Sequence, residues 1–292
     1  MKYNRVAPTR EVVERLCRGS IDMHAHNAPD PDVERRANAL EMAYGMRETG
    51  QRGVVLKSFF YPTAPLTEMV KMVVPEVDTF GSVTIGYSCG GFNAGMIAEQ
   101  ARMGCKVVWM PAFDSYYFMK GIGMEGGYRL LDDDGKLLPE VVEVLKVIKE
   151  YDLVVCSGHI RFDEAYALFD KANQMGITKM VATHPLAFTP CRMTMEQVHT
   201  LADMGAYIEH VYGQCFPRLG GLDPQVYVDC VKEIGAERSI FSSDFAQNTD
   251  PMPSEGFRMG IGTMLQYGCT EEEMEWMVKK NPYKLLGLEY KE

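Results

Sequence analysis

Short apolar runs alternate with amphipathic stretches along the whole chain, and this alternation constrains the fold more than any other sequence feature. Apolar runs of strand length separated by helical segments are typical of a parallel sheet whose strands are joined by crossover helices. We count eight such runs, at residues 21–26, 53–60, 82–89, 105–113, 153–159, 179–185, 206–212 and 239–245. Eight strands in 292 residues are typical of a (β/α)8 TIM barrel, an α/β fold of about 250 residues before additions.

Helix boundary signals lie between the apolar runs. Glycine follows segments 34–49, 93–103 and 163–175, where helix ends favour a left-handed residue. Thr194 and Thr270 each stand three residues before a Gln or Glu, the spacing of a capping box. Because no repeat, no low-complexity tract and no Ser- or Gly-rich linker interrupts this pattern, we expect a single domain over residues 1–292.

One long segment, 112–138, separates the fourth apolar run from its helix. Loops of this length are usually functional or disordered. Aromatic residues among its glycines, including Tyr116, Tyr117 and Phe118, favour a small hairpin or a lid over one end of the barrel. The acidic run 132–134 lacks the alternating acids of a calcium loop, so we expect a solvated turn there.

Charge and composition exclude several classes of protein. The chain has 30 Lys and Arg residues against 40 Asp and Glu residues, a formal net charge of −10, which is the wrong sign for binding a phosphate backbone. No apolar stretch approaches the roughly 20 residues that span a bilayer, and the first thirty residues contain no apolar stretch as long as that of a signal peptide. The eight cysteines form no C-x-x-C pair, which favours reduced, structural thiols. We expect a cytoplasmic protein that binds a small-molecule substrate, without nucleic-acid or membrane partners; homo-oligomerisation is left open.

Residues of the metal-ligand type stand at the ends of the predicted strands. His24 and His26 end the first strand on the same face, His159 and His184 end the fifth and sixth, and Asp244 ends the eighth. The carboxyl ends of barrel strands converge on one face, where barrel enzymes build their sites. Imidazole and carboxylate groups suit zinc and similar divalent ions. The sequence therefore predicts a site for one or two divalent ions, with Zn²⁺ as the expected metal.

This pattern resembles the amidohydrolase superfamily of metal-dependent barrel enzymes. His24-Ala25-His26 is similar to the family's H-x-H, and His159, His184 and Asp244 follow in the family's strand order. The run 281–288, NPYKLLGL, also resembles the end of such barrels. The resemblance implies a hydrolase that uses metal-activated water on an amide, cyclic amide or lactone. It also implies that Asp244 transfers the proton and that His184 polarises the substrate carbonyl.

One departure from the family concerns lysine. The fourth strand lacks the Lys or Glu that bridges two metals in the binuclear branch, and the lysine at a strand end is Lys57 on the second strand. Lys57 is predicted first to hold a substrate carboxylate, second to carry a carbamate that bridges two metals, and third to be structural. A related branch without the strand-four lysine implies an alternative function, non-oxidative decarboxylation of a small carboxylic acid. A non-catalytic, metal-binding regulatory barrel is the alternative of another class.

Five further residues are candidates for substrate binding. Tyr116 and Tyr117 belong to the long segment, and Arg161 follows His159 closely enough to clamp an anionic substrate. Gln247 follows Asp244 and could orient it, with loop capping as the alternative. His210 ends the seventh strand, and there the alternative is a hydrogen-bonded structural imidazole.

Overall fold

The computed structural model describes residues 6–245 and 247–291. These residues form two compact units. Unit 1 takes the described parts of Met1–Leu56, Met69–Thr79 and His210–Glu292, and unit 2 takes Lys57–Glu68 and Phe80–Glu209. The treatment of residues 1–292 as one domain stays a prediction.

Eight strands follow one another in chain order in one eight-stranded sheet. They are β1 (Ile21–His26), β2 (Gly53–Lys57), β3 (Asp78–Thr84), β4 (Cys105–Trp109), β5 (Val154–Cys156), β6 (Met180–Ala182), β7 (Tyr207–Val211) and β8 (Ser239–Ser242). Within unit 2 the pairing is parallel, with Val108 opposite Val155 and Val181 opposite Tyr207. Parallel strands in chain order with helices between them confirm the predicted (β/α)8 barrel fold class.

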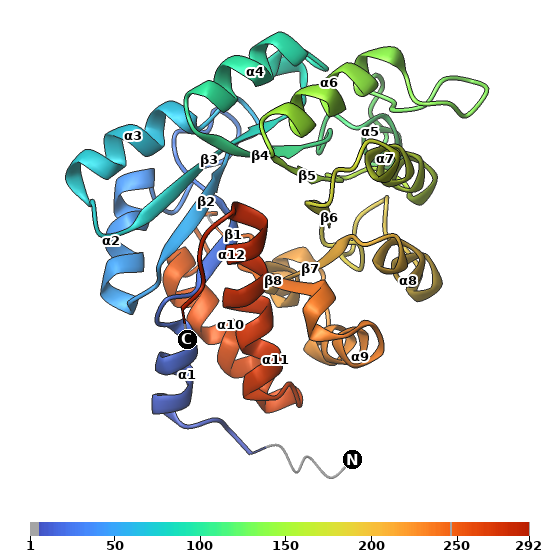
Figure 1. Ribbon diagram of the computed structural model, residues 1–292. Helices are drawn as coiled ribbons and strands as arrows, with labels where there is room; N and C mark the ends of the chain where they lie inside the picture. The colour runs from blue at the N-terminus through green and yellow to red at the C-terminus, as the bar shows by residue number, and fades with distance from the viewer. Residues whose placement is uncertain (1–5, 246, 292) are drawn as a thin grey trace. The chain divides into compact units, whose positions relative to one another are not determined.

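Unit 1 contains β1, β8 and the helices near the two chain ends. These helices are α1 (Arg10–Cys17), α2 (Ala39–Thr49), α9 (Pro224–Ile234), α10 (Pro253–Tyr267), α11 (Glu271–Glu275) and α12 (Asn281–Leu286). Figure 1 shows α10 to α12 in orange and red beside β1 and β8, and α10 packs against α1, α2 and α9. Helix α2 begins later than predicted, because the side chain of Asn38 accepts from the N–H groups of Leu40 and Glu41 and so caps the helix there.

Unit 2 contains β4, β5 and β6 with the helices that precede and follow them. These helices are α4 (Ala94–Arg102), α5 (Tyr116–Gly121), α6 (Pro139–Glu150), α7 (Phe162–Gln174) and α8 (Met195–Asp203), and α3 (Ala64–Val73) is shared by the two units. Figure 1 shows α4 and α6 as neighbours on one side of this unit. The capping box predicted at Thr194 is present at the start of α8.

Several strands end earlier than predicted. Residues Tyr87–Cys89 form a 3₁₀ helix instead of the end of β3, and β5, β6 and β8 stop two or three residues before His159, His184 and Asp244. The backbone turns out of the extended conformation at this point, as the positive φ angles of His184 and Asp244 show. The three ligand-type residues therefore lie just after the strands rather than within them.

The long segment 112–138 contains both a helix and a hairpin. Helix α5 is followed by an antiparallel bridge between Leu131 and Leu137, which forms the predicted hairpin. The Asp132 carboxylate accepts from the N–H groups of Asp134 and Lys136, at 3.0 and 2.9 Å, and so closes an exposed turn. The role of the segment as a lid stays a prediction.

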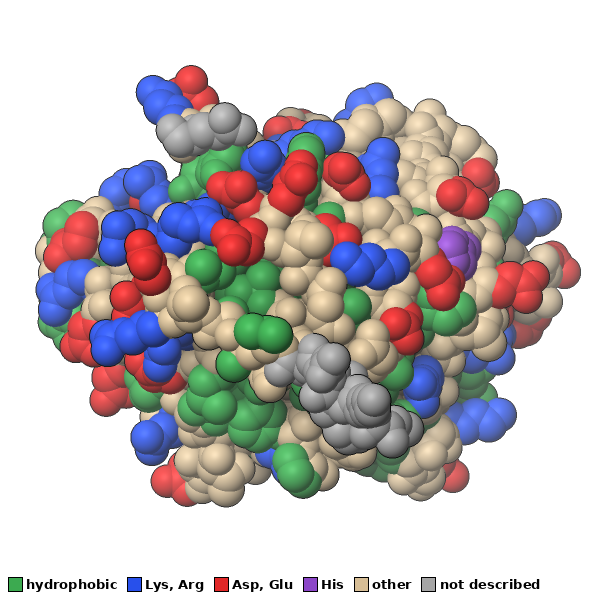
Figure 2. Space-filling view, turned by 90° about the horizontal axis from the view of Figure 1, so that it is seen from below, with side chains coloured by type: hydrophobic (Ala, Val, Ile, Leu, Met, Phe, Trp, Pro, Cys, Tyr) green, Lys and Arg blue, Asp and Glu red, His purple; other side chains and the backbone are tan. Residues whose placement is uncertain are grey.

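Charged side chains lie on the surface (Figure 2), and most cysteines are buried. Acidic and basic side chains are interspersed over the face that Figure 2 shows. Within the described ranges, no helix is both long and apolar enough to cross a membrane. All eight cysteines are free thiols, and burial raises the pKa of Cys17 to about 11 and that of Cys105 to about 12.

Candidate metal centre

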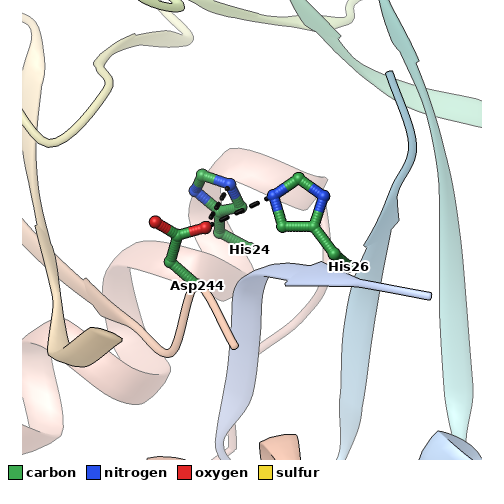
Figure 3. A group of neighbouring side chains, drawn as sticks. All are labelled: His24, His26 and Asp244. Atoms are coloured by element: carbon green, nitrogen blue, oxygen red, sulfur yellow. Dashed lines mark ion pairs between the residues drawn. The ribbon is translucent and has the colours of Figure 1, made fainter. Parts of the chain in front are cut away.

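Three ligand-type side chains converge in unit 1. Alternation along β1 places His24 and His26 on the same face, and Asp244 follows β8. The Oδ1 atom of Asp244 lies 3.3 Å from Nε2 of His24 and 3.3 Å from Nε2 of His26, as Figure 3 shows. Both imidazoles are buried, and the Asp244 side chain is 14% exposed, so the group lies at the edge of the protein interior.

These distances match the size of a small divalent ion. An ion that holds nitrogen and oxygen ligands at about 2.0–2.1 Å in tetrahedral geometry separates neighbouring donor atoms by about 3.3 Å. The two separations of 3.3 Å correspond to edges of such a tetrahedron, and the three donor atoms all lie within 4.8 Å of one another. Two imidazoles and one carboxylate leave a fourth position for water. The three residues therefore fit a divalent ion.

The backbone at the end of β8 turns Asp244 toward β1. Asp244 has a φ of 52°, a left-handed conformation that Asp and Asn adopt more readily than most residues. Its N–H donates to the carbonyl oxygen of His24 at 2.8 Å, and the N–H of His26 donates to the carbonyl oxygen of Phe245 at 3.0 Å. Strained conformations of this kind cost about 1–3 kcal/mol and cluster at functional sites.

A second carboxylate, Asp22, lies in the same unit and was missed by the sequence reasoning. Its side chain is fully buried, and its Oδ1 accepts from the N–H groups of His24 and Ser243, at 3.1 and 3.0 Å. Burial raises the pKa of Asp22 to about 7, against the lowering effect of these hydrogen bonds. The signal available in the sequence was an acid two residues before His24, on the same face of the predicted strand as His24 and His26.

Unit 2 contains a second pair of ligand-type residues, His159 and His184. Their Nε2 atoms are 3.3 Å apart, again the length of a tetrahedral edge. Two reciprocal hydrogen bonds hold the chains before them: the Gly158 N–H donates to Thr183 Oγ1 at 3.0 Å, and the Thr183 N–H donates to Ser157 Oγ at 2.9 Å. That this pair and the group of unit 1 serve the same site stays a prediction.

Aromatic side chains surround His159. The rings of Phe113 and Phe118 lie 5.5 and 5.0 Å from the His159 ring, and Phe59 lies 4.5 Å from Phe113. Phe113 is 48% exposed although it is a large apolar residue. The imidazole of His159 therefore borders an open apolar surface.

Lys57 is fully buried in unit 2. Its Nζ lies 4.8 Å from the Trp109 ring centroid and 5.1 Å from that of Phe59, which are cation–π distances. Burial raises the pKa of Cys156 well above its usual value, Glu209 raises it further and Lys57 lowers it, so both charges act on the same thiol. The buried Glu209 was also missed by the sequence reasoning, and a carbamate on Lys57 would add a second negative charge to its surroundings.

The five predicted substrate-binding residues are divided between the two units, three in unit 2 and two in unit 1. The Arg161 guanidinium stacks 3.4 Å from the Tyr117 ring centroid and pairs with Asp163. Tyr116 packs against Tyr117, with ring centroids 5.0 Å apart. The structure thus brings Arg161, Tyr116 and Tyr117 together in unit 2.

The other two candidates lie in unit 1. His210 is fully buried, with Nε2 at 3.4 Å from Ser239 Oγ and its ring 5.0 Å from that of Tyr227 on α9. The substrate-binding role of His210 stays a prediction. The Gln247 N–H donates to Asp250 at 3.0 Å, and Asp250 in turn accepts both arms of the Arg218 guanidinium, at 2.6 and 2.8 Å.

Comparisons with solved structures confirm the fold. An amidohydrolase from Pseudomonas aeruginosa superposes with a TM-score of 0.66 at 11% identity, covering 94% of this chain and 97% of the other. A probable 2-pyrone-4,6-dicarboxylic acid hydrolase from Acinetobacter baumannii gives 0.60 at 15%, covering 92% and 100%. A 2,6-dihydroxybenzoate decarboxylase gives 0.54 at 12%, covering 93% and 100%. The resemblance to the amidohydrolase superfamily therefore holds at the level of the fold.

Sequence comparison places the chain in a family. No curated protein matches it in sequence. A family model matches residues 19–209, well over half of the chain, a range that includes His24, His26, His159 and His184. The chain belongs to this family, described as a family of unknown function (DUF6282).

Proposed function

We propose that this protein is a metal-dependent hydrolase that acts on an amide, cyclic amide or lactone of a small molecule. The convergence of His24, His26 and Asp244 at 3.3 Å carries the proposal, since it matches the ligand spacing of a divalent ion. Structural neighbours described as an amidohydrolase and a 2-pyrone-4,6-dicarboxylic acid hydrolase support the reaction class. Zn²⁺ is the proposed metal.

Four residues of the protein have separate roles in the proposed reaction. His24, His26 and Asp244 would hold the ion, which when bound would lower the pKa of a water molecule toward about 7. The Asp244 carboxylate, partly exposed beside both imidazoles, accepts a proton during attack and returns it to the leaving group. His184 polarises the substrate carbonyl, and its positive φ of 27° marks a conformation held by its surroundings.

Metal content tests the central proposal. Protein purified without added metal is expected to contain at least one divalent transition ion per chain, measured by elemental analysis. Because an ion that binds only the folded state stabilises it, chelation is expected to lower the melting temperature, and Zn²⁺ is expected to restore it. A saturating ion at 1,000 times Kd contributes about 4 kcal/mol. Absence of bound metal together with an unchanged melting temperature would contradict the proposal.

The metal count also distinguishes the roles of Lys57. Two ions with a carboxylated Lys57 would support the bridging role. One ion and a free amine would exclude the bridging role and leave substrate binding or a structural role for Lys57. Stoichiometric metal without turnover of any substrate class would favour the regulatory alternative.

The second candidate function is decarboxylation of an aromatic acid. It is favoured by the rings of Phe113 and Phe118 beside His159, and by the buried Lys57, which lies over the ring of Phe59. Such a surface can hold a ring flat while a cation binds a carboxylate. A structural neighbour is described as 2,6-dihydroxybenzoate decarboxylase in complex with 2,6-dihydroxybenzoate.

A matched pair of phenylalanines tests whether this aromatic surface binds substrate. Phe113 and Phe188 are equally exposed, at 48% and 47%, but Phe113 borders His159 whereas Phe188 contacts Arg192. Phe113→Leu is expected to raise the KM for an aromatic acid about 2- to 10-fold, because ring stacking contributes about 0.5–1.5 kcal/mol, while Phe188→Leu leaves it unchanged.

A screen of cyclic amides, lactones and aromatic acids supplies the substrates and distinguishes the two reactions. Release of CO₂ without incorporation of ¹⁸O from labelled water supports decarboxylation, and incorporation of ¹⁸O without release of CO₂ supports hydrolysis.

A further inference from the structure

A buried carboxylate shares a face of β1 with two of the proposed metal ligands. Asp22, His24 and His26 are alternate residues of the strand, so their side chains leave it on the same side. Asp22 has no exposed surface, and a buried carboxylate is costly unless hydrogen bonds compensate it. The hydrogen bonds that Asp22 accepts therefore identify the backbone segments that it holds in position.

One oxygen of Asp22 joins the two chain segments that carry the ligands. Its Oδ1 accepts from the backbone N–H of His24 at 3.1 Å and from that of Ser243 at 3.0 Å. Ser243 immediately precedes Asp244, so the bond holds the chain one residue before the third ligand. The same atom thus fixes a point on β1 and a point after β8.

The chain after β8 needs such an acceptor because the strand has already ended. Strand β8 stops at Ser242, and Asp244 takes up its left-handed φ of 52° two residues later. Ser243 adds two contacts of its own, since its Oγ donates to the His24 carbonyl oxygen and accepts from the Phe245 N–H, both at 3.3 Å. Without Asp22, the N–H groups of His24 and Ser243 would lose their acceptor in the interior.

We propose that Asp22 is a positioning residue that sets the distances between the Asp244 carboxylate and the imidazoles of His24 and His26. The inference rests on the proposed metal function. Metal ligands must be held within about 0.5 Å of their productive geometry. A shift of residues 243–245 against β1 changes the 3.3 Å separations directly, because Asp244 is carried by that segment.

Asn281 supplies a matched control in the same unit. It too is buried, and its amide donates two hydrogen bonds to the backbone, to the carbonyl oxygens of Ala236 and Ser239 at 2.8 and 2.7 Å. These bonds hold the beginning of β8, whereas those of Asp22 hold the chain after its end. Asn281→Ala therefore removes a comparable buried contact without touching the segment that carries Asp244.

The experiment measures Co²⁺ binding and the visible absorption spectrum of the Co²⁺-loaded full chain, beside thermal unfolding of the metal-free proteins. Asp22→Ala is expected to weaken Co²⁺ binding about 10- to 100-fold, the usual effect of losing a group that orients a ligand, and to shift the spectrum. Asp22→Asn keeps an acceptor oxygen and is expected to recover most of the affinity and the spectrum. Asn281→Ala is expected to lower the melting temperature while both Co²⁺ readouts stay at wild type.

The outcomes separate this role from the proposed function. If the wild type binds no Co²⁺, the metal proposal fails and the role of Asp22 fails with it. If the wild type binds Co²⁺ and Asp22→Ala keeps its affinity and spectrum, only the positioning role is overturned. Equal weakening by Asn281→Ala also overturns it, because the effect is then one of general stability. Should Asp22→Ala not fold, Asp22→Ser keeps a polar side chain in the interior, but it is too short to accept from the Ser243 N–H as Asp22 does. It is expected to weaken Co²⁺ binding and shift the spectrum, and wild-type affinity and spectrum would overturn the proposal.

Discussion

Asp244→Asn is expected to abolish turnover while leaving the fold and part of the metal affinity intact. The amide keeps the shape of the carboxylate, and Asn tolerates the left-handed backbone that Asp244 adopts at φ 52°. It cannot accept the proton that Asp244 is proposed to carry between water and leaving group. Loss of general acid–base catalysis costs about 10²- to 10⁴-fold, so kcat should fall at least that far.

A second aspartate provides the control for this substitution. Asp152 has nearly the same backbone conformation, with a φ of 53°, but its side chain is 80% exposed and pairs with Lys179. Asp152→Asn is expected to leave kcat unchanged, which shows that the Asp-to-Asn exchange at a left-handed position is itself harmless. The measurement is kcat at saturating metal, with metal content determined in the same samples. Activity of Asp244→Asn within a few-fold of wild type would contradict the assigned role.

Gly158→Ala is expected to destabilise the protein by about 3 kcal/mol or more. Gly158 precedes His159 and has a φ of 64°, where a side chain costs about 1–2 kcal/mol. A Cβ at this position would also stand 2.2 Å from the carbonyl oxygen of Met110 and 2.6 Å from that of Pro111. Both contacts are with backbone, which cannot rotate away, and crowding of this kind costs a further 1–3 kcal/mol or so.

Gly176 serves as a control that separates the cost of the positive φ from the cost of the backbone clash. It has a similar φ of 78°, yet a Cβ there would meet nothing within 4 Å. Gly176→Ala therefore carries only the conformational cost of about 1–2 kcal/mol. Denaturant unfolding of both variants measures the difference, which is the contribution of the close approach to residues 110 and 111. Equal destabilisation by the two variants would show that the chain before His159 is not tightly packed.

The fold class could be predicted because its signals are local. Each apolar run, each glycine after a helix and each capping box depends on a few neighbouring residues, so the eight strands and the boxes at Thr194 and Thr270 were recognisable from the sequence. The exact strand ends were not, because they depend on pairing with strands that are distant in the sequence. Residues 87–89 continue an apolar run in the sequence, but in the structure they form a 3₁₀ helix after β3.

The candidate site was predictable only as residue types at strand ends. The sequence by itself determined that His24 and His26 share one face of a strand, since alternation along a strand is a property of the backbone. The tertiary structure decided that the Asp244 carboxylate turns toward them, and that the buried Asp22 holds the backbone of both segments. It also placed Lys57 among the rings of Phe59 and Trp109. These contacts join residues up to 221 positions apart in the chain, so no local pattern can encode their distances; packing of the folded chain sets them.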